Sequence, residues 1–280
     1  CSGRRRSSKL ERGSNELMNQ ADSDTSRICA WASRQLADYD ARQPGSVFAD
    51  GVTLNVAEAY QLQSAVSDLR LHRGDRIIGY KVGCTSPRIR EQLGIDHCVS
   101  GRLYESEQYA SAAVLSREGF AKLAIEGELA VELSREPTDD DFLEVGIPAC
   151  VSRVIPVIEL HNHVMRGQQP TAGELIGHNA LHAGFVAGCG VKPEEAPRNP
   201  SLAIFADGQL LDGCEGPMLI ETIRSSLKWL RDMLQARGDR LGPGQIILTG
   251  SIPSLISIDE DCIIRVEAGP LGHVEVKFIA

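Results

Sequence analysis

Residues 123–133 alternate between apolar and acidic side chains, and this pattern constrains the fold more than any other segment. Successive side chains of a β-strand point to opposite faces, so period-two alternation predicts a strand. Glu126 and Glu128 then lie on the same face, roughly 7 Å apart along the strand. Gly127 between them leaves room for the close approach of a backbone or a ligand. The segment therefore predicts a strand that presents two neighbouring carboxylates.

These two carboxylates have two interpretations. Taken alone, they are typical of the solvated outer face of an antiparallel sheet. Alternatively, carboxylate oxygens bind a hard cation such as Mg²⁺ or Mn²⁺. A third acid, Glu159, follows the apolar segment 154–158, and an acid that closes a buried strand is seldom without a partner. We therefore predict a metal site formed by Glu126, Glu128 and Glu159.

The chain divides into three parts by the character of its sequence. Residues 1–23 are polar and lack hydrophobic periodicity, so we expect a disordered tail. Residues 24–98 are expected to form a helical α/β part with one strand, at 77–83. Residues 99–280 carry short β-type runs punctuated by Gly, Pro and Asp-Gly, which favour an all-β or α+β body. The expected fold class is α+β.

Periodicity, capping residues and turn residues locate the individual elements. Thr53 is the expected N-cap of the second helix, and Asp207 with Gly208 predicts a hairpin turn. The expected helices cover residues 24–43, 53–72, 87–94 and 221–237. The expected strands cover residues 77–83, 123–133, 154–160, 183–186, 202–205, 245–249, 262–266 and 273–278.

Composition excludes several classes of protein. The 29 Lys and Arg residues against 38 Asp and Glu give a formal net charge of −9, which argues against nucleic-acid binding. No apolar run reaches the roughly eighteen residues that span a bilayer, so we expect a soluble protein without membrane contact. The eight cysteines include no C-x-x-C pair and are typical of small buried residues in a reducing compartment. We therefore expect a cytoplasmic location.

Two further motifs carry polar groups that could act together with the acids. Lys81 lies between Gly79 and Gly83 on a hydrophobic strand. It is either a lysine whose charged end reaches the surface or an acid/base partner of the carboxylates. Residues 248–251, Leu-Thr-Gly-Ser, leave a strand into a turn that offers hydroxyl and N–H groups to an anion.

A series of short motifs runs in order along residues 25–280. They are Ala59-Tyr60-x-x-Gln63, Gly79-x-Lys81-x-Gly83-x-Thr85-Ser86, Leu93-Gly94-x-Asp96, Glu126-x-Glu128, Ile158-Glu159, Asn179-Ala180, Trp229-Leu230 and Leu248-Thr249-Gly250-Ser251. The ordered set resembles the 2-keto-4-pentenoate hydratase and 4-oxalocrotonate decarboxylase group of the fumarylacetoacetate hydrolase superfamily.

The resemblance implies a mixed β-roll body with a helical N-terminal part, assembled into a homo-oligomer. It implies a divalent cation, Mg²⁺ or Mn²⁺, held by Glu126, Glu128 and Glu159, and a small 2-oxo acid that chelates this cation. It gives Lys81 a role in substrate binding or proton transfer. The substrate-binding positions that it implies are Thr85, Asn179, Thr249, Gly250 and Ser251.

Two departures from the group's motifs involve histidines. Relatives usually have Asp-Asn-Ala-Ser where this chain has His178 and then Asn-Ala-Leu, and an acid that usually follows Glu159 is absent. Four histidines lie within 22 positions: His161, His163, His178 and His182. They are either polar residues around a cleft, or metal-binding pairs on one strand face (161 and 163) and one helix face (178 and 182). Alternatively, a histidine replaces the missing Asp in proton transfer. We predict catalytic roles for Lys81 and His178.

The predicted function is a metal-dependent lyase of aromatic catabolism. This enzyme is expected to hydrate a short 2-hydroxydienoate or 2-oxo-enoate to a 4-hydroxy-2-oxo acid. A bound cation can stabilise the enolate charge that develops on such a substrate during the reaction. The same site could decarboxylate or tautomerise a 2-oxo dicarboxylate, or hydrolyse a β-diketone C–C bond. A homologue without catalysis, which binds a ligand or stabilises an enzyme partner of the pathway, is the alternative of another class.

Overall fold

The computed structural model describes residues 25–280, so the predicted tail at 1–23 and the first residue of the predicted helix at 24–43 lie outside the described residues. The first helix covers residues 25–40. The other α-helices are α2 Ser46–Ala49, α3 Val56–His72, α4 Pro87–Leu93, α5 Ala172–Gly177 and α6 Met218–Gln235. The 3₁₀ turns are η1 Glu105–Glu107, η2 Arg117–Gly119, η3 Asp139–Phe142, η4 Asn179–Leu181, η5 Pro193–Glu195 and η6 Gly269–Leu271.

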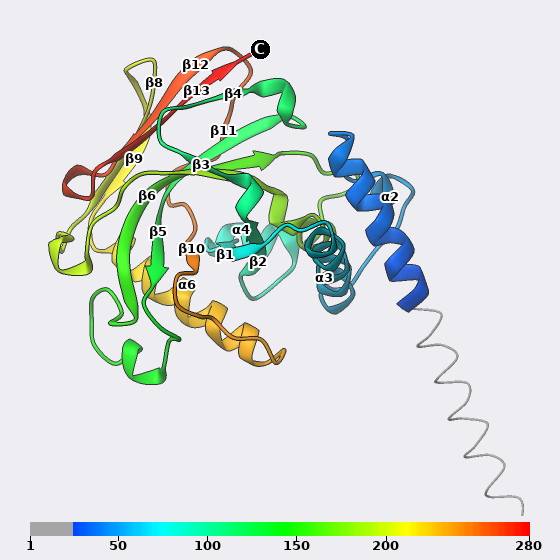
Figure 1. Ribbon diagram of the computed structural model, residues 1–280, viewed down its shortest axis with the longest axis horizontal. Coiled ribbons are helices and arrows are strands. Elements are labelled where there is room, and N and C mark those ends of the chain that lie inside the picture. The colour runs from blue at the N-terminus through cyan, green and yellow to red at the C-terminus, as the bar shows by residue number, and fades with distance from the viewer. Residues whose placement is uncertain (1–24) are drawn as a thin grey trace, which may run out of the picture.

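The strands form two sheets, an eight-stranded sheet with the order β2-β1-β10-β5-β6-β7-β3, in which β11 also pairs with β5, and a five-stranded sheet with the order β4-β13-β12-β8-β9. The strands are β1 Ile77–Gly83, β2 Val99–Tyr104, β3 Gln108–Ala110, β4 Ala113–Ser116, β5 Leu123–Leu133, β6 Val151–Asn162, β7 His182–Ala187, β8 Ser201–Ala206, β9 Gln209–Glu215, β10 Ile246–Leu248, β11 Ile256–Ser257, β12 Cys262–Glu267 and β13 His273–Ile279. In Figure 1 the helix over residues 25–40 and α3 lie on the side of the molecule opposite to β8 and β9.

The long curved strands β5 and β6 are the centre of the eight-stranded sheet (Figure 1). They pair antiparallel over their whole length, and β10 pairs with the other edge of β5. β1 joins this sheet through a parallel pairing with β10, in which Gly79 is the partner of Ile246. The predicted boundary between residues 98 and 99 therefore runs through one continuous sheet. The division of the chain into an N-terminal part and a β-roll domain at this boundary stays a prediction.

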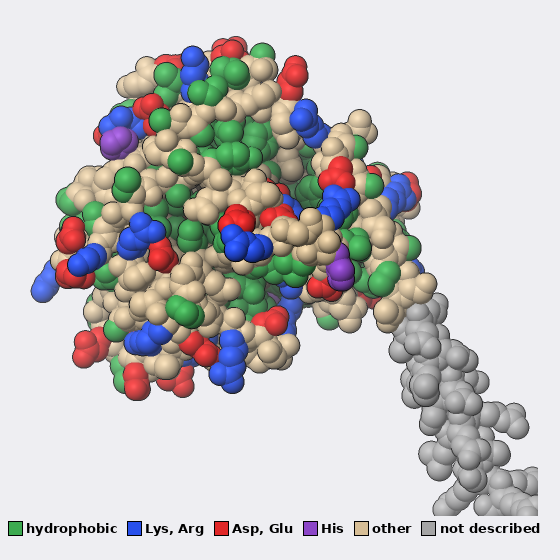
Figure 2. Space-filling model, in the orientation of Figure 1, with side chains coloured by type: hydrophobic (Ala, Val, Ile, Leu, Met, Phe, Trp, Pro, Cys, Tyr) green, Lys and Arg blue, Asp and Glu red, His purple; other side chains and the backbone are tan. Residues whose placement is uncertain are grey.

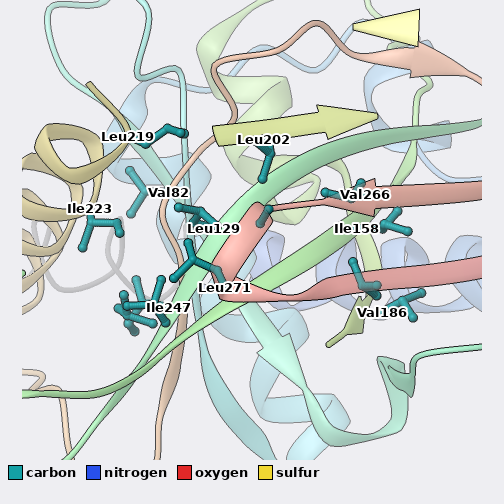
Figure 3. Packing of buried hydrophobic residues seen from close by; sticks show 14 of the residues in the cluster. Val82, Leu129, Ile158, Val186, Leu202, Leu219, Ile223, Ile247, Val266 and Leu271 are labelled. Carbon is teal, nitrogen blue, oxygen red and sulfur yellow. The ribbon is translucent and has the colours of Figure 1, made fainter. Parts of the chain in front are cut away.

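One face of the eight-stranded sheet packs against α6 and the five-stranded sheet. Figure 3 shows Val82 and Leu129 of the first sheet in one cluster with Ile223 of α6 and with Leu202 and Val266 of the second sheet. The predicted apolar stripe of α6 is confirmed, since its members are all buried: Ile223, Leu227, Leu230 and Leu234. This packing leaves the opposite face of β5 and β6 for the polar groups described below.

Local sequence explains two boundaries of these elements. Asn55, rather than the predicted Thr53, caps α3, because its side chain accepts from the Glu58 N–H while the Glu58 carboxylate accepts from the Asn55 N–H. Asp207 and Gly208 both have positive φ and connect β8 to β9, so the predicted hairpin is confirmed.

Charged side chains of both signs are interspersed over the face shown in Figure 2, and this face has no extended basic patch. Among residues 25–280, no helix combines the length and the hydropathy that crossing a membrane requires.

Candidate metal centre

The register of β5 and β6 places acidic side chains opposite one another. Glu126 is the direct partner of Glu159, and Glu128 is the partner of Val157. Directly opposed residues of antiparallel strands share a face, so Glu126, Glu128 and Glu159 all point to the side away from α6. Lys81 joins this face because its partner on β10, Leu248, is in turn the partner of Ala130 on β5. Three neighbouring strands thus bring one lysine and three acids together.

Glu159 is the most heavily contacted acid of the group. Its Oε1 lies 2.9 Å from the Lys81 Nζ and 2.7 Å from the His182 Nδ1, and its Oε2 lies 3.5 Å from the His161 Nε2. Burial alone raises the pKa of Glu159, but the charge of Lys81 and the two imidazoles outweigh it, so the pKa is well below its ordinary value. Glu159 therefore remains a carboxylate at neutral pH.

Glu128 is in a different environment, although it is equally buried. Only 1% of it is exposed, so the interpretation of a solvated outer face is wrong for this residue. Its Oε2 accepts from the Gly250 N–H at 2.5 Å, whereas its Oε1 is buried without a hydrogen-bond partner. Burial, followed by the nearby charges of Glu159 and Glu126, holds the pKa of Glu128 well above its ordinary value. A cation would relieve this repulsion.

The arrangement fits a divalent cation. One oxygen each of Glu126 and Glu159 and one ring nitrogen of His161 lie within 4.8 Å of one another. Three acids face a single ammonium, that of Lys81, in this cluster, and one buried carboxylate oxygen of Glu128 has no partner. Excess negative charge and unsatisfied oxygen donors are what a hard cation neutralises. Glu126 is the more exposed acid, since 23% of its side chain is accessible, so it is the open side of the cluster.

Lys81 is buried beside the acids and does not reach the surface. Its Nζ donates to the Ala180 carbonyl at 3.2 Å in addition to its contact with Glu159. Burial lowers the pKa of Lys81, but the carboxylates Glu159, Glu126 and Glu128 raise it more, so the net pKa is above its ordinary value. The lysine is consequently an ammonium that can donate a proton.

An unusual backbone turn presents the Ala180 carbonyl to Lys81. Asn179, Ala180 and Leu181 have φ values of 55°, 53° and 62°, a left-handed conformation that L-residues seldom adopt in succession. The Asn179 side chain supports the turn by donating to the Arg102 carbonyl at 2.8 Å and accepting from the Arg102 N–H at 2.7 Å. Asn179 therefore positions backbone next to Lys81, while its predicted contact with substrate stays a prediction.

His178 is buried in a different environment. Its ring packs against Phe48 with 5.0 Å between the centroids and against Tyr39 with 6.3 Å, and Gln35 Nε2 lies 3.5 Å from its Nδ1. Burial, assisted by the charge of Arg166, lowers its pKa to about 3. His178 is neutral at physiological pH, and its assignment to proton transfer stays a prediction.

The Thr-Gly-Ser turn reaches the cluster through its backbone. Thr249 donates its hydroxyl to the Leu129 carbonyl at 2.7 Å, and Ser251 donates to the Gly127 carbonyl at 3.0 Å. Gly250 has a φ of 94°, and a Cβ there would lie 2.6 Å from the Thr85 side chain, which places Thr85 against the turn. The turn thus anchors Glu128, and its predicted role as a binding site for substrate oxygens stays a prediction.

Two histidines join the acids, and the prediction of catalytic residues did not include them. His161 follows Glu159 by two positions on β6 and shares its face. His182 is the first residue of β7 and not part of a helix, so the suggested helix face shared with His178 is wrong. A register shift between β6 and β7 makes His182 the partner of His161, which turns it toward Glu159. The clustering of histidines in the sequence was a signal, but the orientation of His182 depends on this bulge.

The sequence is similar over most of its length to 2-keto-4-pentenoate hydratases and 4-oxalocrotonate decarboxylases. No family model matches the chain. It is 25% identical over 222 residues to a 2-keto-4-pentenoate hydratase of Burkholderia vietnamiensis, covering 79% of this chain and 85% of the relative. It is 26% identical over 226 residues to a 4-oxalocrotonate decarboxylase of a Pseudomonas species, covering 80% of this chain and 87% of the relative.

Solved structures show the same fold. The 4-oxalocrotonate decarboxylase of Pseudomonas putida G7, complexed with magnesium and adipate, matches with a TM-score of 0.81 and 22% identity over 91% of this chain and 98% of the other. A fumarylpyruvate hydrolase of Pseudomonas aeruginosa, in complex with Mn²⁺ and pyruvate, matches with a TM-score of 0.55 and 14% identity over 71% and 88%. The chain therefore shares the fold of these structures, in agreement with the predicted fumarylacetoacetate hydrolase type of fold. In sequence, the chain resembles the 2-keto-4-pentenoate hydratase and 4-oxalocrotonate decarboxylase group, as its motifs predict.

Proposed function

We propose that this protein is a metal-dependent hydro-lyase. It converts a short 2-hydroxydienoate, through its 2-oxo-3-enoate tautomer, to a 4-hydroxy-2-oxo acid by the addition of one water molecule. The observation that carries the proposal is the meeting of Glu126 and Glu159 with the buried Lys81 on one face of the eight-stranded sheet. The similarity to 2-keto-4-pentenoate hydratases supports the reaction class.

The acids of the cluster hold the cation in this proposal, with Glu126 and Glu159 as ligands and Glu128 beside them. When bound, a divalent cation supplies Lewis-acid stabilisation of the negative charge that develops on the 2-oxygen of the substrate. The burial of Glu128 and Glu159 keeps water away from this charge, which strengthens every electrostatic contact.

Lys81 is the proton donor and acceptor of the proposed reaction. An ammonium has three N–H donors, and two of them are directed at Glu159 and the Ala180 carbonyl within the described residues. The third can deliver a proton to the terminal carbon of the dienol, and the resulting amine takes up the proton that the 2-hydroxyl loses, so the 2-oxo-3-enoate forms and the ammonium is restored. The raised pKa keeps this proton on Lys81 until the substrate takes it.

Decarboxylation of a 2-oxo dicarboxylate is the second candidate, because curated relatives at 24–26% identity are 4-oxalocrotonate decarboxylases. The two reactions separate in a direct assay. The purified protein is given Mg²⁺ or Mn²⁺ and either 2-hydroxypenta-2,4-dienoate or 4-oxalocrotonate. Loss of the dienoate absorbance with formation of the 4-hydroxy-2-oxo acid supports hydration, and release of CO₂ from 4-oxalocrotonate favours the alternative. Metal-dependent binding of both acids without turnover would identify a homologue that has lost catalysis.

Three variants assign the residues. We expect Glu126→Gln to lose metal binding by calorimetry together with turnover, and Lys81→Ala to keep metal binding while turnover falls by about 10²–10⁴-fold. Glu132→Gln is the matched control, because Glu132 lies on the same strand but pairs with Arg153 outside the cluster. Undiminished turnover in Lys81→Ala would remove the lysine from the mechanism.

The choice between Mg²⁺ and Mn²⁺, the homo-oligomeric assembly and the cytoplasmic location belong to the same proposal. Relatives with bound magnesium and with bound Mn²⁺ support a divalent cation in general. The assembly is supported by the family resemblance, and the location by a cysteine pattern without C-x-x-C pairs. Sedimentation of the purified protein measures its oligomeric assembly directly.

A further inference from the structure

His161 occupies an unusual position for a histidine that has only a structural role. Its Nε2 lies 3.3 Å from the Glu126 Oε2 and 3.5 Å from the Glu159 Oε2, and both distances exceed those of ordinary N–H···O hydrogen bonds. The side chain is 4% exposed, and Nε2 is buried without a hydrogen-bond partner. A buried, unpaired nitrogen aimed at two carboxylates needs an explanation.

The spacing of these three atoms is that of ligand atoms around one ion. Ligands at about 2.1 Å from a cation in octahedral geometry lie about 3 Å apart when adjacent and about 4.2 Å apart when opposite. The nitrogen–oxygen distances at His161 are close to the first value, and all three atoms fall within 4.8 Å of one another. A shared ion would therefore satisfy the nitrogen and both oxygens together.

The surroundings select which oxygen of Glu159 is available. Its Oε1 accepts from Lys81 and lies 2.7 Å from His182, so this oxygen is occupied. Its Oε2 is the oxygen that faces His161. The partner of His161 on β5 is Ala124, whose small side chain leaves the imidazole room on this face. The contacts of Lys81 and His182 hold Glu159 in place with its Oε2 toward His161, just as hydrogen bonds to a metal-binding side chain orient it toward its metal.

We propose that His161 Nε2 is a metal ligand, so that the cation binds to Glu126, Glu159 and His161. The inference rests on the metal-binding part of the proposed function and gives it a chemical preference. Imidazole nitrogen suits later transition metals such as Fe²⁺, Ni²⁺ and Zn²⁺, whereas carboxylate and water oxygens suit Mg²⁺ and Mn²⁺. The mixed site consequently favours a transition metal over Mg²⁺ more strongly than three carboxylates would.

Pulsed electron paramagnetic resonance of the Mn²⁺-loaded protein tests the ligand directly. A coordinated imidazole gives a ¹⁴N modulation, which we expect in the wild-type protein and expect to be lost in His161→Gln. His163→Gln is the matched control, because His163 lies two residues further along the chain but outside the three-residue group. No ¹⁴N modulation in the wild-type protein, or one that persists in His161→Gln and disappears in His182→Gln, would overturn the proposal.

Calorimetric titrations give a second, independent readout. We expect His161→Gln to weaken Co²⁺ binding at least 10-fold and to change Mg²⁺ binding much less, whereas His163→Gln keeps the wild-type ratio. An unchanged Co²⁺ to Mg²⁺ ratio in a folded His161→Gln would contradict the inference. Where that variant does not fold, His182→Gln decides: a ¹⁴N modulation that persists in His182→Gln supports His161 as the ligand, and one that disappears overturns the proposal.

These readouts separate the two proposals. Hydration of the dienoate without ¹⁴N modulation would support the proposed function and contradict His161 as a metal ligand. The ¹⁴N modulation without turnover would support His161 as a ligand and contradict the proposed function.

Discussion

His178 gives the fold a pH dependence that can be calculated from its environment. It is 1% exposed, and its ring lies between Phe48 and Tyr39. Burial, with the charge of Arg166, lowers its pKa from 6.5 to about 3. Because the unfolded chain binds this proton more readily than the folded one, the contribution of neutral His178 to stability is fully present above pH 6.5. It is lost progressively as the pH falls toward 3.

The size of the effect follows from the two pKa values. The linkage relation gives a loss of about 2 kcal/mol of folding free energy between pH 7 and pH 5 from this one group. Nearly all of the loss arises from protonation of the unfolded chain, since the folded-state pKa of about 3 lies below this range. The effect is a large fraction of the stability of an ordinary domain.

Urea unfolding at pH 7 and pH 5 measures this contribution in the wild-type protein and in His178→Gln, at one protein concentration. The fluorescence of Trp31 and Trp229, which pack against hydrophobic clusters, reports the transition. We expect the wild-type protein to lose about 2 kcal/mol more than the variant between the two pH values. His72→Gln is the control, because His72 is exposed on α3, and it is expected to follow the wild-type protein.

Equal losses in the wild-type protein and in His178→Gln would refute the argument that His178 is held neutral by burial. The same variant tests the predicted catalytic role. A large loss of turnover at pH 7 in a His178→Gln variant that remains stably folded would support proton transfer by His178.

The remaining predictions concern the buried acid and the closely packed sheet. Glu128→Gln is expected to stabilise the metal-free protein by about 1–3 kcal/mol, because the amide removes a buried charge beside Glu159 and Glu126. Thermal unfolding in the presence of a chelator should show a higher Tm for the variant than for the wild-type protein. Added Mn²⁺ should raise the Tm of the variant less than that of the wild-type protein. A metal-free variant with a lower Tm than the metal-free wild-type protein would contradict this prediction. Gly79→Ala is expected to destabilise the fold by several kcal/mol, because a Cβ would lie 1.8 Å from the Ile246 carbonyl. Wild-type urea unfolding in this variant would show that β1 and β10 can separate at little cost.

Period-two and helical patterns predicted most of the secondary structure. The segment 123–133 is a strand with the predicted bounds, and the predicted strand at 77–83 is β1. The alternation in β5 did not reveal that both faces are covered, because the burial of Glu128 depends on segments that are distant in the sequence, such as the turn at Gly250. Short strands such as β3 and β11 escaped prediction, since three or two residues carry no periodicity.

The candidate site was predicted in part. Glu126 and Glu159 could be paired from sequence because each shows an acid on an otherwise apolar strand, and Lys81 could be added from its glycine neighbours. The face of His161 follows from its spacing of two positions from Glu159 on β6, but the orientation of His182 could not be predicted. The orientation of His182 depends on the register shift between β6 and β7, which no local sequence pattern specifies. The role of Gly127 also differs, because a Cβ there would meet Ile204 and Val266 of the second sheet rather than a ligand.

The position of β10 has a consequence for biosynthesis. Within the eight-stranded sheet, β10 lies between β1 and β5, so its backbone pairs with both strands. A nascent chain already contains Lys81, Glu126 and Glu159 long before the ribosome has made residues 246–248. Until that short strand has been made, the backbone pairing that places Lys81 beside the acids in one sheet is incomplete. The arrangement that the proposed cation site requires is therefore finished only after residues 246–248 have been added, however early the two parts of the sheet begin to fold.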